Sequence, residues 1–147
     1  MRTICCDRRG HVLVTTPVSP NDANDPALAM TVDDVCRLAW DYESMRTMSA
    51  RELIARSGYR DRWRSITVAL LAHTLREHPD WVDAWIQWSA DKRVSSGWYI
   101  ARRGEAAFDV GQYPAIAPVR YGDLIQACAV FVRYELGWIA DIGPLPE

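Results

Sequence analysis

The segment 91–97, with the sequence Asp-Lys-Arg-Val-Ser-Ser-Gly, carries the residue types in this chain that best suit ligand binding. It puts two cations, two hydroxyls and a glycine into a predicted loop between a helix and a strand, where backbone N–H groups can converge on an anion. It lacks the Gly-x-x-x-x-Gly-Lys-Ser/Thr spacing of a phosphate-binding loop. Two interpretations stay open, a polar loop that sets the direction of the next strand and an anion site. The residues of such a site are Lys92, Arg93, Ser95, Ser96 and Trp98.

The histidines and cysteines do not form a pattern typical of a metal centre or a catalytic site. His73 and His78 are five residues apart on a predicted helix, which places them about 140° apart around its axis, so they share no face. The first two cysteines are adjacent, which matches no zinc spacing. Cys36 and Cys128 fall on apolar faces of predicted helices, where a thiol behaves as a small hydrophobic group. No Gly-x-Ser-x-Gly motif occurs, and we expect no metal, no cofactor and no enzymatic activity.

Tryptophan is the compositional outlier, with seven residues. Each ring exposed to water forfeits a large apolar burial, so we expect most of them in the core. Trp81, Trp85 and Trp88 follow the i, i+4, i+7 spacing of one helix face. Core packing against the preceding helix is the favoured interpretation; a stacking platform for a ligand and a surface for a protein partner are the alternatives. Asp80 and Asp83 on the same helix argue against nucleic acid, which requires a positive groove.

Charge and hydropathy exclude two further classes of partner. The formal charge is −2, from 17 basic and 19 acidic residues whose signs are interleaved, which favours neither direct nucleic-acid binding nor binding to an anionic membrane. The longest apolar runs, such as 66–72, are far shorter than the roughly 20 residues that cross a bilayer. Charged residues near the N-terminus stand where a signal peptide is apolar, so we expect a cytoplasmic protein.

The elements that must position these residues are predicted to form one domain. A chain of 147 residues, 49% hydrophobic and 24% charged, suits a single globular domain over 1–147. We expect residues 1–30 to be irregular, with a short hairpin over 3–16 as one interpretation. Residues 31–92 are predicted to be helical.

Local signals divide this helical region. The capping-box spacings of Thr31 with Asp34 and of Ser49 with Glu52 predict helices over about 31–46 and 49–58. A long apolar helix over 59–78 follows, and Pro79 starts the next one. Since the long helix is apolar over much of its circumference, we expect it to be the central element.

The last third of the chain changes in character. Two apolar runs flank the turn-like 102–105 segment, which predicts a β-hairpin over 97–111. An irregular connector over 111–118 and a C-terminal helix over 121–140 follow. The predicted fold is mainly α with a small antiparallel β-hairpin, an α+β class with about five helices around a central Trp-rich helix pair.

The segment 89–100, Ser-Ala-Asp-Lys-Arg-Val-Ser-Ser-Gly-Trp-Tyr-Ile, together with the size of the chain, resembles immunity proteins of bacterial toxin–immunity systems, including contact-dependent inhibition. This resemblance implies a protein that binds and neutralises a cognate toxin, with a nuclease as the expected target. Acidic groups would then mimic phosphates toward a basic toxin cleft and speed association. The acidic candidates are Asp80, Asp83, Glu105 and Asp109.

Two other classes of function stay open. One is a regulatory domain that binds a small molecule or anion through Arg93, Ser95 and Ser96 with the Trp98 ring. The other is an enzyme, for which the sequence offers no residue to choose. A protein partner is therefore the preferred expectation.

Overall fold

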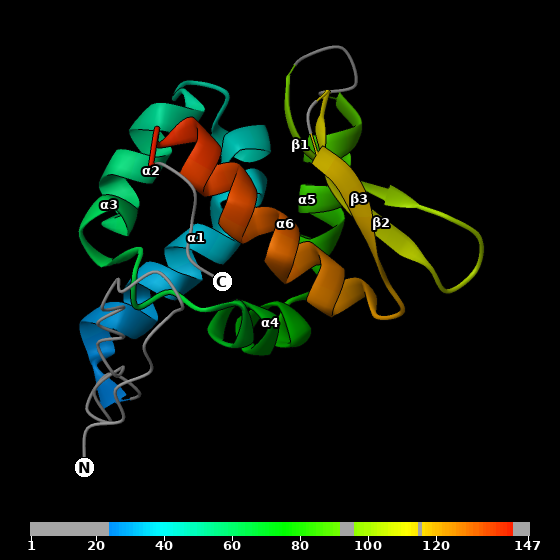
Figure 1. Ribbon diagram of the computed structural model, residues 1–147. Coiled ribbons are helices and arrows are strands. Elements are labelled where there is room, and N and C mark those ends of the chain that lie inside the picture. The colour runs from blue at the N-terminus through cyan, green and yellow to red at the C-terminus, as the bar shows by residue number, and fades with distance from the viewer. Residues whose placement is uncertain (1–23, 92–95, 115, 143–147) are drawn as a thin grey trace, which may run out of the picture.

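The computed structural model describes residues 24–91, 96–114 and 116–142 (Figure 1). Within them the chain forms six helices and one antiparallel sheet of strand order β1-β2-β3, which confirms the α+β class. Figure 1 shows most helices on one side, the sheet on the other and α6 passing between them. The elements are α1 (Pro26–Met45), α2 (Ala50–Ser57), α3 (Tyr59–Arg62), α4 (Val68–Glu77), α5 (Pro79–Asp91), β1 (Gly97–Arg102), β2 (Phe108–Tyr113), β3 (Ile116–Tyr121) and α6 (Leu124–Ile139).

The predicted long helix over 59–78 is wrong, because the chain breaks it into α3 and α4. Thr67 adopts extended backbone angles, φ −92° and ψ 158°, and its hydroxyl accepts a hydrogen bond from the Leu70 N–H at 3.2 Å. A threonine in this position caps a new helix instead of continuing the old one. The apolar periodicity runs through the break because both pieces bury their apolar side chains in the same core.

The central element is α6, and not the 59–78 region. Six consecutive residues, Ala127 to Val132, are at most 8% exposed, so this part of the helix is buried around its whole circumference. Such a helix must be covered on more than one side. It contacts α4 and α5 as well as all three strands, and therefore packs against both the helices and the sheet.

The tryptophan stripe of α5 is only partly a core feature. Trp85 alone among the seven tryptophans is fully buried, and its Nε1 donates to the Cys36 carbonyl at 2.7 Å while its ring meets Phe131 edge-on. Trp88 Nε1 donates to Glu135 Oε1 at 3.0 Å. The stripe therefore packs against α1 and α6, and the expected packing against the preceding helix is wrong as the main contact. Five of the seven tryptophans nevertheless lie in the core or pack against it, as expected, and the two exposed ones are Trp40 and Trp138.

The N-terminal half of the chain shows how local signals succeed and fail. The capping box of Ser49 and Glu52 begins α2, and Gly58 ends it at φ 76°, both as predicted. By contrast α1 begins at Pro26, because Asp25 caps it by accepting from the Ala27 N–H at 2.9 Å. Thr31 lies inside α1, so the predicted start there is wrong, as is the irregular segment for its residues 26–30. The hairpin considered over 3–16 lies outside the described residues.

The predicted hairpin is confirmed as β1 and β2, closed by the Arg103 N–H, which donates to the Ala107 carbonyl at 2.7 Å. The predicted connector over 111–118 is wrong, because a third strand, β3, pairs with β2. The sequence did not predict this strand because it contains Pro118, and proline is rare within strands. A proline is tolerated in β3 because an edge strand leaves some of its N–H groups unpaired. The C-terminal helix is confirmed as α6.

The other edge of the sheet is held by one side chain of α5. The hydroxyl of Ser89 donates to the Ile100 carbonyl at 3.1 Å and accepts from the Ile100 N–H at 2.9 Å. Both residues are buried. One serine therefore satisfies two main-chain groups of edge strand β1 and ties α5 to the sheet.

We predict that Ser89→Ala lowers the free energy of unfolding by about 1–3 kcal/mol, because it leaves buried main-chain groups of Ile100 without a partner. Urea denaturation measures the change. The control is Ser44→Ala on the exposed surface of α1, where we expect a change within about 0.5 kcal/mol. Equal effects of the two substitutions would contradict the assigned role.

Tyr59 gives a second prediction, which concerns pH. Its buried hydroxyl has no hydrogen-bond partner among the described residues, and burial raises the pKa of the phenol to about 12. Its unfolded value is about 10, so the folded state holds the proton more tightly. This contribution to stability is complete below pH 10 and is lost as the pH rises through 12.

Tyr59→Phe removes both the titration and an unsatisfied hydroxyl. We expect its free energy of unfolding at pH 7 to stay within about 1 kcal/mol of the wild-type value or to exceed it. Between about pH 10 and pH 12 the variant should lose less stability than the wild type, because it has no phenol to ionise at this position. Urea unfolding over this range measures both, and a steeper loss in the variant would overturn the assignment.

Candidate binding groove

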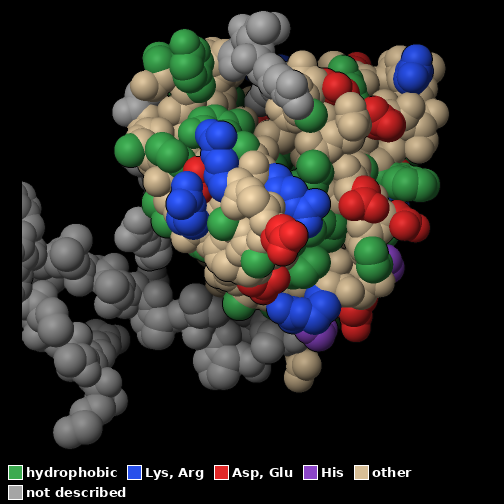
Figure 2. All heavy atoms as spheres, turned by 90° about the vertical axis from the view of Figure 1, so that its right-hand side faces the viewer, with side chains coloured by type: hydrophobic (Ala, Val, Ile, Leu, Met, Phe, Trp, Pro, Cys, Tyr) green, Lys and Arg blue, Asp and Glu red, His purple; other side chains and the backbone are tan. Residues whose placement is uncertain are grey.

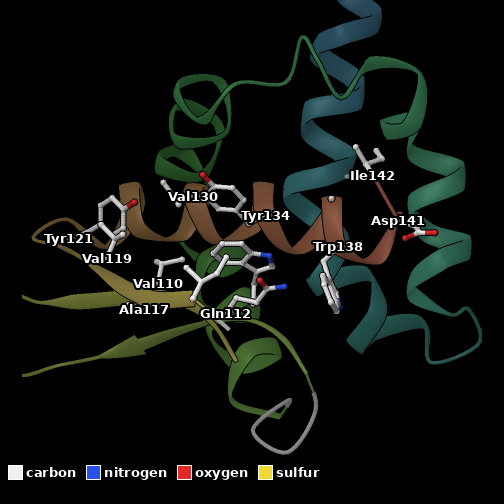
Figure 3. Close-up of a pocket in the computed structure, with 13 residues that line it drawn as sticks. Val110, Gln112, Ala117, Val119, Tyr121, Val130, Tyr134, Trp138, Asp141 and Ile142 are labelled. Carbon is white, nitrogen blue, oxygen red and sulfur yellow. The ribbon is translucent and has the colours of Figure 1, made fainter. Parts of the chain in front are cut away.

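A groove of about 620 Å³ lies between α6 and the face of the sheet turned toward it (Figure 3). Its volume falls in the range of about 300–1,000 Å³ that is common for ligand sites. Most of its surface is apolar. The lining residues are Trp98, Val110, Gln112, Ile116, Ala117, Val119, Tyr121, Val130, Tyr134, Gly137, Trp138, Asp141 and Ile142.

Strand pairing and helical spacing explain why these residues meet. Alternate residues of a strand point to the same face, and directly paired residues share a face. Trp98 pairs with Gln112, and Val110 pairs with Val119, so the sheet contributes side chains from all three strands. On α6 the contributing residues Val130, Tyr134 and Trp138 are four apart and form one stripe. Figure 3 shows Val130 and Tyr134 on the helix facing Val110 and Val119 on the strands.

Two stacked rings form a rigid part of the groove. The rings of Trp98 and Tyr134 have centroids 4.2 Å apart and planes inclined by 14°. Both residues are half-buried. Trp98 is thus the candidate from sequence analysis that the structure places in the groove, and its contact with Tyr134 ties β1 to α6.

The rim of the groove exposes large apolar side chains. Ile116 is 47% exposed, Val119 is 56% exposed and Trp138 is 49% exposed. A contiguous exposed apolar area of this kind is typical of a binding surface. These three residues line the same groove, whereas the other large exposed apolar side chains lie outside it: Met30, Trp40, Tyr42, Met45 and Tyr113.

The C-terminal end of α6 brings a carboxylate to one end of the groove. Asp141 has a left-handed backbone, φ 56°, and the Ile142 N–H turns back to donate to the Gly137 carbonyl at 2.9 Å. This is the hydrogen bond that closes a Schellman motif at a helix end. Figure 3 shows Asp141 and Ile142 beyond Trp138. The described lining residues include this carboxylate and the Gln112 amide, and no lysine or arginine.

The other sequence candidates that the structure describes do not line the groove. Asp80 and Asp83 are exposed near the start of α5, Glu105 is exposed in the hairpin turn, and Ser96 is exposed just before β1. Lys92, Arg93 and Ser95 lie outside the described residues. Of the six candidates within the described residues, only Trp98 lines this concave site.

Asp109 requires a correction, because it is not an available acidic group. The residue is only 4% exposed, and its carboxylate is paired with Arg120 and Arg103. The Arg120 guanidinium, and then that of Arg103, hold the pKa of the carboxyl below its usual value. The expected role failed because Arg120 lies on β3, a strand that the sequence did not predict.

Sequence analysis missed most of the groove residues. Tyr134 and Trp138 appeared as parts of an apolar helix, although their spacing of four residues from Val130 is a signal for a shared stripe. Ile116 lies in the predicted connector over 111–118, and Val119 lies between that connector and the helix predicted from residue 121. No local pattern reveals that an undetected strand faces the end of α6.

The side chains of the groove are suited mainly to apolar packing against a bound group. Rings and alkyl groups dominate, with one amide and one carboxylate. Elsewhere, burial raises the pKa of the Cys128 thiol to about 12 and also raises that of Cys36, so both stay protonated near pH 7. Among the described residues no three His, Cys, Asp or Glu side chains could hold a metal ion, and no helix is long and apolar enough to cross a membrane.

The groove is thus defined by its lining residues, its volume and its mainly apolar surface. The exposed rim and the stacked Trp98–Tyr134 pair belong to a three-stranded sheet packed on α6. Comparisons of the chain with protein-family models, with curated proteins and with solved structures find no match.

Proposed function

We propose that this protein acts by binding another protein, and that the groove between the sheet and α6 is its docking site. The observation that carries the proposal is the half-exposed Trp138 on the rim, beside Ile116 and Val119. Interfaces have apolar, aromatic-rich centres, and exposed tryptophans in pockets are frequent anchors of binding energy. The preformed stack of Trp98 on Tyr134 lowers the entropy lost on binding.

The charge around the groove favours a basic partner. Asp141 is the charged residue among those that line it, and Asp80, Asp83 and Glu105 are exposed elsewhere on the surface. A partner that offers an apolar side chain next to a lysine or arginine complements this arrangement. Acidic surface groups also accelerate the approach of a basic protein at low salt.

A bacterial toxin is the partner class that we propose, on the resemblance of the 89–100 segment to immunity proteins. A nuclease fits the charge argument, because an enzyme that binds nucleic acid carries basic residues around its cleft. In this proposal the protein meets the toxin in the cytoplasm and prevents access to its substrate.

The test is co-expression and co-purification with the product of the neighbouring gene. We expect a stable complex and relief of that product's toxicity. No association, together with unchanged toxicity, would overturn the toxin proposal.

We predict that Trp138→Ala weakens this complex by at least about 30-fold, the size expected for an anchor residue that contributes about 2 kcal/mol or more. Trp40→Ala is the matched control, because Trp40 on α1 is exposed to a similar extent, 45%, and does not line the groove. Biolayer interferometry measures affinity, and thermal unfolding establishes that both variants are folded. Equal losses of affinity would place the interface elsewhere.

A second candidate function is small-molecule binding in the same groove, which its volume and aromatic lining favour. We expect a ligand of this class to change the fluorescence of Trp138 and to raise the melting temperature. A screen with nucleotides and phosphorylated metabolites, repeated on Trp138→Ala, measures both. If the wild type shows no change with any compound, this candidate is excluded for those compound classes.

A further inference from the structure

The face of the sheet that is turned away from the groove carries a polar cluster. Asp109 lies between Phe108 and Val110, whose side chains are buried toward α6, so strand alternation turns Asp109 to the other face. Arg120 is its partner across β3, and Arg103 follows the end of β1. We call Asp109, Arg103 and Arg120 the outer-face triad. Figure 2, which views the side of the molecule where the sheet lies, shows arginine side chains, with acidic ones among them, near the middle of that face.

The geometry of the triad fixes both guanidinium groups on one carboxylate. Arg120 donates through Nε to Oδ1 at 2.8 Å and through Nη2 to Oδ2 at 3.2 Å. Arg103 donates through Nε to the same Oδ2 at 3.1 Å. A nitrogen of each guanidinium group therefore lies within hydrogen-bond distance of the same oxygen atom, Oδ2.

The carboxylate of the triad is buried, whereas its two guanidinium groups are exposed. The side chain of Asp109 is 6% exposed, whereas those of Arg103 and Arg120 are 57% and 65% exposed. Each guanidinium has five N–H donors. Arg103 donates to Asp109 through Nε alone, and Arg120 donates through Nε and Nη2. The carboxylate is thus already satisfied, while N–H groups of both arginines stay open to solvent.

Charge balance gives the reason to look for a ligand. The triad holds two positive charges and one negative charge, so one positive charge is left unbalanced on its exposed side. A second anion on the solvent side would neutralise the excess charge and relieve the repulsion between the two guanidinium groups. Arginine forks bind phosphate and carboxylate oxygens through paired hydrogen bonds.

We infer that Arg103 and Arg120 form a binding site for an oxyanion, a phosphate or carboxylate group, and that Asp109 is the positioning residue that holds the two guanidinium groups together. The site lies on the face of the sheet opposite the docking groove. The oxyanion site is therefore separate from the proposed docking site, and an experiment can overturn one proposal without overturning the other.

The test uses inorganic phosphate as the probe and follows the arginine Nε–Hε resonances by NMR at constant ionic strength. We expect saturable shifts for Arg103 and Arg120 and no saturable shift with chloride. Arg103→Gln should reduce phosphate affinity at least about tenfold, because it removes charge-assisted hydrogen bonds. This variant leaves Asp109 paired with Arg120, which keeps the domain folded.

Two further variants separate a binding site from a structural ion pair. Arg120→Lys keeps the charge and loses the fork, and should also reduce phosphate affinity, whereas Arg60→Gln, at an exposed arginine of α3, should leave it unchanged. Acetate is titrated in a separate series. The anion that binds with the higher affinity shows whether the ligand is a carboxylate or a phosphate. Linear, chloride-like shifts with both anions, or equal losses in all three variants, would overturn the inference.

Discussion

The structure depends on the burial of α6. A helix that is buried around its whole circumference must be covered on more than one side. Here other helices cover one side of α6 and the sheet covers the other. Phe131 of α6 meets Trp85 of α5, and the inner face of β2 supplies Phe108 and Val110. The helical layer and the sheet are therefore two halves of one core.

The groove follows from a mismatch in this arrangement. The middle of α6 is fully covered, whereas its C-terminal part reaches Trp138, which remains half exposed beside β3. The sheet is asymmetric as well, because Ser89 of α5 covers the β1 edge while the side chains of β3 lie mostly in solvent. Pro118 lacks an N–H, which disfavours the pairing of another strand with β3.

The two faces of the sheet serve different chemistry because strand alternation separates them. Apolar and aromatic residues face α6, and the outer face combines the Asp109 ion pairs with Tyr99, whose hydroxyl oxygen lies 2.8 Å from where a Cβ would stand on Gly111. Only glycine allows the ring to lie so close to β2 at this point. A binding groove and an arginine pair can thus occupy one small sheet without contact.

The sequence by itself determined the local features: the α+β class, the capped start of α2, the β1–β2 hairpin and the approximate span of α6. These depend on caps, turns and periodicity between residues close in the chain. Tertiary structure decided the rest. α3 ends at Arg62 and Thr67 caps α4 within a continuous apolar pattern, and β3 forms only because β2 offers it a partner. The pairing of Asp109 with Arg120 and the stacking of Trp98 on Tyr134 likewise join distant elements, and no local spacing encodes which strand or helix will lie opposite.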